Sequence, residues 1–312
     1  MGGPFNFSFP DFSFAFLSIL FEGLPFLLLG TIISGLVDQF LPARMMTRLL
    51  PRNPYLGAVV SGLLGILFPM CECGVVPVIR RLMAKGLPPS NAITYMLAAP
   101  IVNPIVALST YAAFKGQSPA EVVIFRLGIG FVVAVIVGIV VHKLPIRHVL
   151  RTNILADIAQ PQGLSHAPGG GVGPRLWGAL HTCVGDFLSM AVYFVLGAMI
   201  AATFNTAVNQ DVILPLAMND WLATASLMGL ATVLSVCSTT DAFIAATFSL
   251  FPTVAKLAFL VFGPMVDLKL IFIYSAVFRK RFVLGLAVGL FLLIGLICVR
   301  LQVILAQRNI AL

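Results

Sequence analysis

Charged side chains are scarce in this chain. Lys, Arg, Asp and Glu make up only 10% of its 312 residues, whereas 60% of the residues are hydrophobic. A soluble globular domain carries about 25% charged residues, and the mean hydropathy here is +1.05. The composition excludes a soluble protein and leaves no stretch for a soluble domain of useful size. The chain is therefore predicted to be an all-α polytopic membrane protein.

Several signatures are missing as well. The five cysteines are an odd number and all lie in apolar stretches, which argues against a secreted disulfide framework. No spacing matches a structural zinc site, a phosphate-binding glycine loop or a nucleophile elbow. We therefore expect no metal and no cofactor, and energy from an ion gradient or a partner subunit. Met1–Asp11 has neither a basic region nor a small-residue cleavage site, so no removable signal peptide is expected.

Basic residues outnumber acidic ones, with a net charge of +8. They cluster between the apolar segments, as the positive-inside rule expects for loops on the cytoplasmic side of a membrane. Membrane topology explains the charge, so we expect the lipid bilayer and no nucleic acid as partner. The predicted location is a membrane that the chain crosses several times.

Six hydrophobic stretches have about the length that spans a bilayer, and two longer ones are interrupted by polar residues. The six are Phe12–Phe40, Ile93–Phe114, Val122–Val141, Trp177–Phe204, Val254–Phe278 and Phe282–Leu305, and the interrupted two are Tyr55–Met83 and Trp221–Phe251. A segment rich in Gly and Pro separates two sets of four. The predicted organisation is a first membrane repeat at 1–143, a cytoplasmic linker at 144–175 and a second membrane repeat at 176–312.

The basic residues favour one topology. If the interrupted stretches enter and leave the membrane on one side as re-entrant hairpins, the clusters Arg44/Arg48/Arg52, Arg80/Arg81/Lys85 and Arg279–Arg281 all lie inside. Each half then has three transmembrane helices plus one broken or re-entrant hairpin, and the second half is inverted relative to the first. Inverted repeats with broken helices are common in secondary transporters. The alternative is eight single crossings, with kinked helices in place of hairpins.

Two polar interruptions carry the sharpest signals. Phe68-Pro-Met-Cys-Glu-Cys-Gly74 lies in the first half and Leu234-Ser-Val-Cys-Ser-Thr-Thr-Asp241 in the second. Thiolates select soft species such as a trivalent metalloid, so Cys71, Cys73 and Cys237 are candidate substrate ligands, although buried cysteines are also ordinary small hydrophobes. The hydroxyls of Ser238 and Thr239 could bind substrate or cap a helix.

Acidic residues at membrane depth are the candidates for proton or ion coupling. Glu72 lies between two thiols and Asp241 ends the second motif; Glu22 and Asp186 lie 49 and 51 positions before Cys71 and Cys237. A second break follows each motif, at Ala99-Pro-Ile-Val-Asn103 and Gly263-Pro-Met-Val-Asp267. Unwound backbone after a proline can line a cavity, which adds Asn103 as a substrate ligand and Asp267 and Lys269 as coupling residues. An Asp267–Lys269 pair could equally be structural.

These motifs resemble a known family, the predicted permeases that include the organoarsenical efflux permeases of the ArsP type. The matching stretches are Pro69–Gly74, Ala99–Pro104, Cys237–Asp241 and Gly263–Lys269. The resemblance covers nearly the whole chain except the linker. It implies an inner-membrane permease and, in the organoarsenical branch, export of trivalent methylated or aromatic arsenicals with cysteine as the ligand.

The resulting interpretation is a secondary transporter that moves a small thiophilic solute through a midplane site and couples this to protons. The resemblance implies a trivalent organoarsenical as one candidate solute. Two other functions stay open from the sequence. Cys71 and Cys73 could cycle as the dithiol of an intramembrane thiol–disulfide oxidoreductase, or the chain could be a passive channel subunit. The sequence also leaves open whether the protein works as a homo-oligomer or with an accessory subunit.

Overall fold

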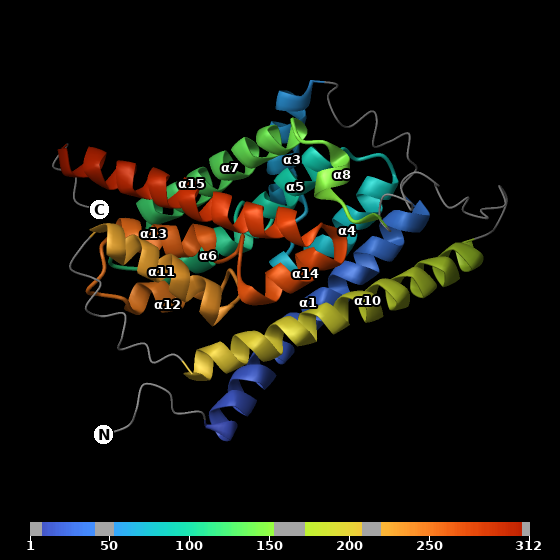
Figure 1. Ribbon diagram of the computed structural model, residues 1–312, viewed down its shortest axis with the longest axis horizontal. Helices are drawn as coiled ribbons and strands as arrows, with labels where there is room; N and C mark the ends of the chain where they lie inside the picture. Colours follow the sequence, from blue (N-terminus) through green and yellow to red (C-terminus); the bar gives the residue numbers. More distant parts are fainter. Residues whose placement is uncertain (1–7, 41–52, 153–171, 208–219, 308–312) are drawn as a thin grey trace.

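The computed structural model describes residues 8–40, 53–152, 172–207 and 220–307, which are mostly helical and form no strand (Figure 1). Within these ranges, four helices are long and apolar enough to cross a membrane. They are α1 (Phe9–Phe40), α7 (Pro119–His142), α10 (Val172–Ala207) and α15 (Lys280–Gln307). The predictions of an all-α fold and of several membrane crossings are confirmed.

The other stretches are pairs of short helices, each pair separated by a few non-helical residues. The pairs are α3 (Pro54–Leu67) with α4 (Glu72–Ala84), α5 (Pro89–Ala98) with α6 (Pro104–Ala113), α11 (Asp220–Leu234) with α12 (Asp241–Thr247), and α13 (Thr253–Phe262) with α14 (Leu268–Val277). One further short helix, α8 (Ile146–Val149), follows α7. All four breaks coincide with the polar motifs of the sequence.

Proline and capping residues explain most of the breaks. Pro69, Pro100 and Pro264 follow the ends of α3, α5 and α13, because proline removes a backbone donor and clashes with the preceding turn. The next helix then begins at a capping side chain: Asn103 accepts from the backbone N–H of Ile105, and Asp267 from that of Leu270. The α11–α12 break instead contains Ser235 at φ 49°, a left-handed conformation that is uncommon for residues other than glycine.

The same helix packings recur in the two halves of the chain. In the first half α5 packs against α3, α4 and α7, and α6 packs against α7. In the second half α13 packs against α11, α12 and α15, and α14 packs against α15. Between the halves, α4 packs on α14 and α6 on α12. Figure 1 shows α1 and α10 crossing along one side of this core, with α7 and α15 on the other side.

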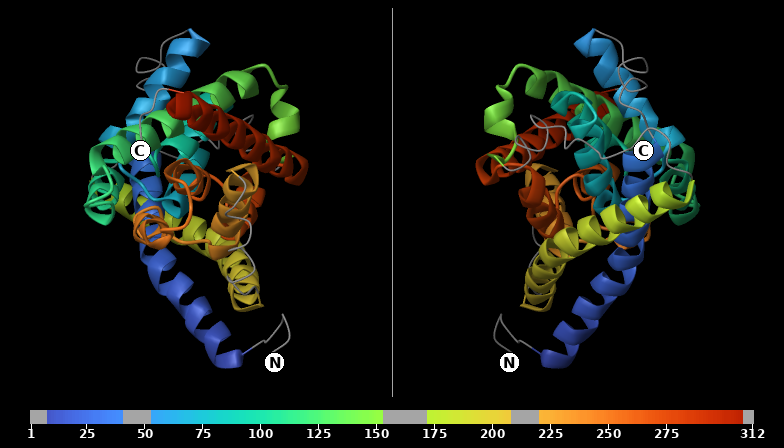
Figure 2. Two further views of the ribbon diagram at one scale, coloured as in Figure 1. Left: turned by 90° about the vertical axis from the view of Figure 1, so that its left-hand side faces the viewer. Right: turned by 90° about the vertical axis from the view of Figure 1, so that its right-hand side faces the viewer.

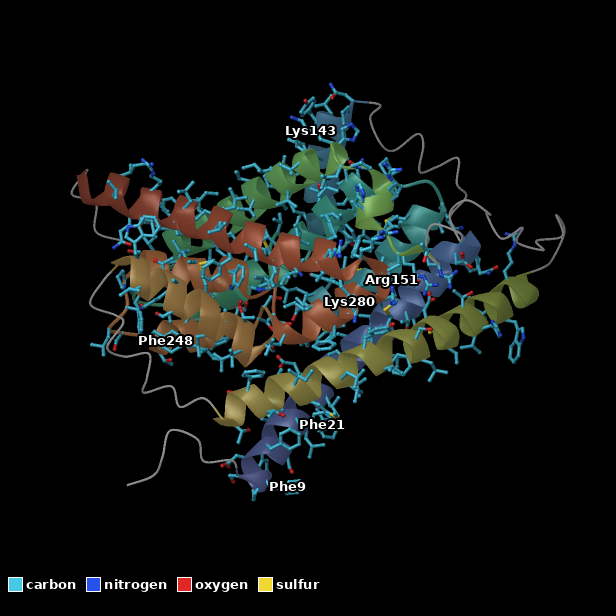
Figure 3. The ribbon with its side chains drawn as sticks, viewed as in Figure 1. Phe9, Phe21, Lys143, Arg151, Phe248 and Lys280 are labelled. Atoms are coloured by element: carbon cyan, nitrogen blue, oxygen red, sulfur yellow. The ribbon has the colours of Figure 1, made fainter. Side chains whose placement is uncertain are left out.

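Large apolar side chains cover the outer surface. Phe9 and Phe21 of α1 are 71% and 76% exposed, and Phe9 lies at the end of α1 that extends beyond the other helices (Figures 2 and 3). Trp177 on α10 and Leu292 on α15 are also exposed. Such a surface is costly in water and suits contact with lipid tails.

The start of the central linker contacts the second half. Leu150 forms an isolated bridge with Phe278, and Arg151 donates to the carbonyl of Ser275 at 3.0 Å and to the hydroxyl of Tyr193 at 3.2 Å. Figure 3 shows Arg151 near Lys280 at the start of α15. Linker residues 153–171 and the cluster of Arg44, Arg48 and Arg52 lie outside the described residues.

Candidate functional site

A buried lysine between two carboxylates forms the centre of the candidate site. Lys269 Nζ lies 3.5 Å from Glu72 Oε1 and 3.4 Å from Asp267 Oδ2, and it donates to the carbonyl of Ser235 at 2.8 Å. The exposed fractions of Glu72, Asp267 and Lys269 are 2%, 1% and 4%. Charges are this deeply buried in proteins only when they are paired. The fold therefore brings together residues that come from the polar motifs of both halves of the chain.

Helix starts position the two carboxylates. Glu72 occupies the first turn of α4, and Asp267 caps α14, with the N–H of Leu270 donating to its Oδ1 at 2.7 Å. The N-terminus of a helix carries partial positive charge and favours a carboxylate there. Asp267 Oδ2 has no hydrogen-bond partner although it is buried. The ammonium of Lys269, at 3.4 Å, is thus the group that compensates this oxygen.

Three cysteines lie at the helix breaks that form the site: two at the start of α4 and one in the α11–α12 break. The N–H of Gly74 donates to Cys71 Sγ at 3.4 Å, so the thiol caps α4, and Cys73 is buried in the first turn. Cys237 Sγ lies 3.6 Å from Thr239 Oγ1. Cys237 precedes Ser238, whose hydroxyl contacts Glu72, so it lies near the thiols of the first motif. All five cysteines of the chain are free thiols, so thiols from both halves are available near the buried lysine.

The hydroxyl of Ser238 connects the second motif to the first. Its Oγ donates to Glu72 Oε2 at a long 3.4 Å, and Ser238 is 2% exposed. Thr239 is half-buried and contacts Cys237 through its hydroxyl. The polar atoms of both motifs therefore face one shared region between α4, α14 and the α11–α12 break.

A second buried ion pair lies beside this region. Arg126 on α7 donates through Nη2 to both oxygens of Asp241, at 2.9 and 2.8 Å, and to the carbonyl of Ser238 at 2.9 Å. Its Nη1 donates to the hydroxyl of Thr110 at 2.7 Å. The sequence analysis missed Arg126, although an arginine inside a 24-residue apolar helix is itself a sign of a buried partner.

The remaining candidates lie elsewhere. Asp186 on α10 accepts from Arg81 Nε at 2.9 Å and Arg81 Nη2 at 2.8 Å, and Arg81 is nine residues along α4 from Glu72, about 13 Å by helical rise. Glu22 on α1 accepts from the hydroxyl of Thr240 at 2.9 Å. Asn103 caps α6 and makes no hydrogen bond or ion pair with the Glu72 cluster among the described contacts.

Metal coordination finds no support in this geometry. Within the described ranges, no group of three or more His, Cys, Asp or Glu side chains is arranged to hold a metal ion. What the arrangement can do is bind a polar or thiol-reactive solute, and accept or release a proton, at a point where several helices are broken. Buried ionisable groups inside an apolar helical protein are typical of membrane transporters.

Comparison with known proteins agrees with that class. Residues 9–303 match the family described as predicted permease, ArsP_1, and the chain belongs to this family. It is 40% identical over 277 residues to the UPF0718 protein YcgR of Bacillus subtilis (strain 168), covering 88% of this chain and 92% of that protein. No solved structure matches.

A second relative comes from Streptococcus mutans serotype c (strain ATCC 700610 / UA159). It is 34% identical over 274 residues, with 86% of this chain and 87% of that protein covered. It carries the provisional description of a two-component membrane permease complex subunit. Membership in a permease family makes the present chain a membrane transporter, as predicted, and not the thiol–disulfide oxidoreductase that the sequence alone left open.

Proposed function

We propose that the protein is a bacterial inner-membrane permease that moves a small thiophilic solute through a site at the helix breaks. The contact between Lys269 and Glu72, at 3.5 Å, carries this proposal, because it joins the two halves at the point where Cys71, Cys73 and Cys237 gather. The resemblance to organoarsenical efflux permeases suggests trivalent organoarsenicals as the class of cargo, since thiolates are their natural ligands.

The two halves are proposed to be inverted repeats, 1–143 and 176–312, joined by a cytoplasmic linker at 144–175. The recurring helix packings support the repeat, as do the capping residues Asn103 and Asp267, which begin equivalent helices. In this arrangement α3 with α4, and α11 with α12, are the two re-entrant hairpins, which enter from opposite sides. Broken helices that meet at the midplane are the recurring binding-site plan of such transporters.

The balance of buried charges supports proton coupling as part of the proposal. Glu72, Asp267 and Asp241 supply three carboxylates, whereas Lys269 and Arg126 supply two cations. An uncompensated charge in a low-dielectric interior is costly, so one proton would complete the balance. Lys269 already occupies the place between Glu72 and Asp267 where a bound metal cation would lie. This favours a proton on one of these carboxylates over a metal cation as the coupling ion. Asp241 is instead paired with Arg126.

An accessory subunit is a further element of the proposal. The name of the Streptococcus mutans relative supports a second component, and a homo-oligomer is the other arrangement. Purification of the tagged protein from its native membrane in mild detergent, with mass spectrometry of whatever copurifies, separates the two. A stoichiometric second polypeptide would establish the complex. One kind of polypeptide in a particle heavier than the monomer would establish the homo-oligomer.

Solute uptake into inverted membrane vesicles tests the proposed function. A methylated and an aromatic trivalent arsenical, arsenite, thiosulfate and cuprous ion form the panel. Wild type is compared with Cys73→Ser and with Cys298→Ser, a buried cysteine away from the site. We expect accumulation of an organoarsenical that Cys73→Ser abolishes and Cys298→Ser preserves. Uptake of no solute, or uptake independent of Cys73, would contradict the proposal.

A further inference from the structure

The crossing pair α1 and α10 lies against only one side of the core. α1 packs on α4, and α10 packs on α14. If the halves are equivalent, these packings have counterparts: α10 on α12, and α1 on α6. Among the described helices, α10 with α12 and α1 with α6 make at most marginal contact. By contrast, the α4–α14 packing does have its counterpart, which is the α6–α12 packing. The pair therefore breaks a correspondence that the α4–α14 and α6–α12 packings keep.

An ion pair fastens the crossing pair at one end. Asp186 of α10 is 2% exposed and receives both Nε and Nη2 of Arg81 from α4, at 2.9 and 2.8 Å. Ser34 of α1 donates to Asp186 Oδ2 at 2.9 Å and to the carbonyl of Pro77 at 3.2 Å. Arg80 Nη1 lies 3.9 Å from Asp186 Oδ1. One carboxylate thus joins three helices, and paired hydrogen bonds from arginine are among the stronger polar contacts.

Backbone packing also holds α1 against α4, at a point nearer to Glu72 than the ion pair is. A Cβ at Gly30 of α1 would lie 2.4 Å from the carbonyl oxygen of Gly74 on α4, so these two helices touch through their backbones. Close approach at glycine is the usual way that membrane helices associate. Lys85, at the end of α4, also contacts the carbonyl of Asp38 at the end of α1. The closure of this end therefore involves more than one contact.

The matching acid in the first half has different surroundings. Glu22 lies 49 positions before Cys71, close to the 51 positions between Asp186 and Cys237, so we take the two acids as counterparts. Glu22 is half-buried and accepts from Thr240, whose side chain is exposed. One acid is thus buried in a paired contact with arginine, and its counterpart is partly open. Such asymmetry between equivalent residues is expected when an inverted-repeat transporter is in one of its two states.

We propose that the Arg81–Asp186 pair is the latch that closes the cytoplasmic end of the transport path, with the crossing pair α1 and α10 as the moving unit. The basic residues Arg80, Arg81 and Lys85 mark this end as cytoplasmic. In the other state the latch opens, and the pair leaves α4 and α14 to pack on α6 and α12. This inference rests on the proposed transport function and assigns Asp186 to gating, away from the Lys269 site.

Labelling of an introduced cysteine at the latch tests the inference. Ser34→Cys places a thiol beside Asp186 at a position that is fully buried. Inverted vesicles expose the cytoplasmic face to a membrane-impermeant maleimide, and mass spectrometry of the peptide isolates position 34 from the native cysteines. We expect slow labelling in the Ser34→Cys parent, and labelling at least tenfold faster when Asp186→Asn is added, because loss of a buried ion pair shifts a two-state population by at least that factor.

Three further variants make the test decisive. Arg81→Lys keeps a cation beside Asp186, so the buried charge stays compensated, but it loses the paired hydrogen bonds. We expect a labelling rate between those of the parent and of Asp186→Asn. The exchange Arg81→Asp with Asp186→Arg should return labelling toward the parent rate. Glu121→Gln, an exposed acid on α7, should leave it unchanged. Equal labelling in the parent, Asp186→Asn and Arg81→Lys would overturn the latch.

The labelling separates the latch from the proposed cargo, because it is measured without any solute. If labelling depends on the latch but no arsenical is taken up, the proposed cargo is wrong and the latch stands. If arsenical uptake is normal and labelling ignores Asp186, the latch is wrong and the proposed function stands.

Discussion

The ammonium of Lys269 lies 3.5 Å from the carboxylate of Glu72, although the two residues come from opposite halves of the chain. Lys269 follows the cap of α14 and Glu72 begins α4, so their contact depends on both helix breaks being in place. With Asp267 on the other side of the ammonium at 3.4 Å, this contact joins the two halves electrostatically. Each half alone would bury charge without a full set of partners.

Loss of Lys269 should destabilise the protein strongly. Lys269→Met leaves Glu72 and Asp267 buried together without a cation, and removing one partner of a buried ion pair costs about 3–5 kcal/mol. Thermal unfolding in detergent, followed by size-exclusion recovery, measures the loss. Lys115→Met removes an exposed lysine and should change little. If the two variants unfold at the same temperature, Lys269 is not electrostatically required.

The Arg126–Asp241 pair predicts a compensating double mutant. Arg126→Gln leaves the Asp241 carboxylate buried without its cation, at a similar cost of about 3–5 kcal/mol. Asp241→Asn added to Arg126→Gln removes the uncompensated charge and should recover much of that stability. The free energy of unfolding of the two single variants and the double variant forms the cycle. Strictly additive losses would mean that the pair is not coupled.

Two glycines of similar helical setting should respond oppositely to alanine. Gly30→Ala would place a methyl group 2.4 Å from the carbonyl oxygen of Gly74, and overpacking of this kind costs about 1–3 kcal/mol. At Gly285 nothing lies within 4 Å, so Gly285→Ala should keep or raise stability by about 0.5–1 kcal/mol through helix propensity. Unfolding temperatures in one detergent compare them. A Gly30→Ala protein as stable as Gly285→Ala would show that α1 and α4 do not touch there.

Glu22 and Asp186 should differ in their effect on stability. Asp186→Asn removes the partner of Arg81 in a buried contact, so a loss of about 3 kcal/mol is expected. Glu22→Gln keeps an acceptor for Thr240 at a half-buried position, so its effect should stay within about 0.5 kcal/mol. Thermal unfolding of both variants in one detergent is the check. Losses of equal size would argue that the two acids have equivalent surroundings.

The sequence predicted the breaks well because proline and capping residues act locally. Pro100 with Asn103 and Pro264 with Asp267 end one helix and begin the next, whatever surrounds them. The partners of buried charges could not be predicted in the same way, since they depend on packing between distant helices. Arg126 with Asp241, and Arg81 with Asp186, are such pairs. Arg126 could have been flagged as an intramembrane charge, but only the fold identifies its partner.

The proton-coupled transport of a thiophilic solute at the Glu72–Lys269 site is the central claim. It is tested most directly in proteoliposomes of the purified protein, with uptake of an aromatic trivalent arsenical and internal pH recorded together. Wild type, Glu72→Gln, Cys73→Ser and the control Cys298→Ser are compared. We predict that wild type and Cys298→Ser couple solute entry to proton movement, that Glu72→Gln loses the proton movement, and that Cys73→Ser loses both. Uncoupled uptake that is equal in all four proteins would contradict the account.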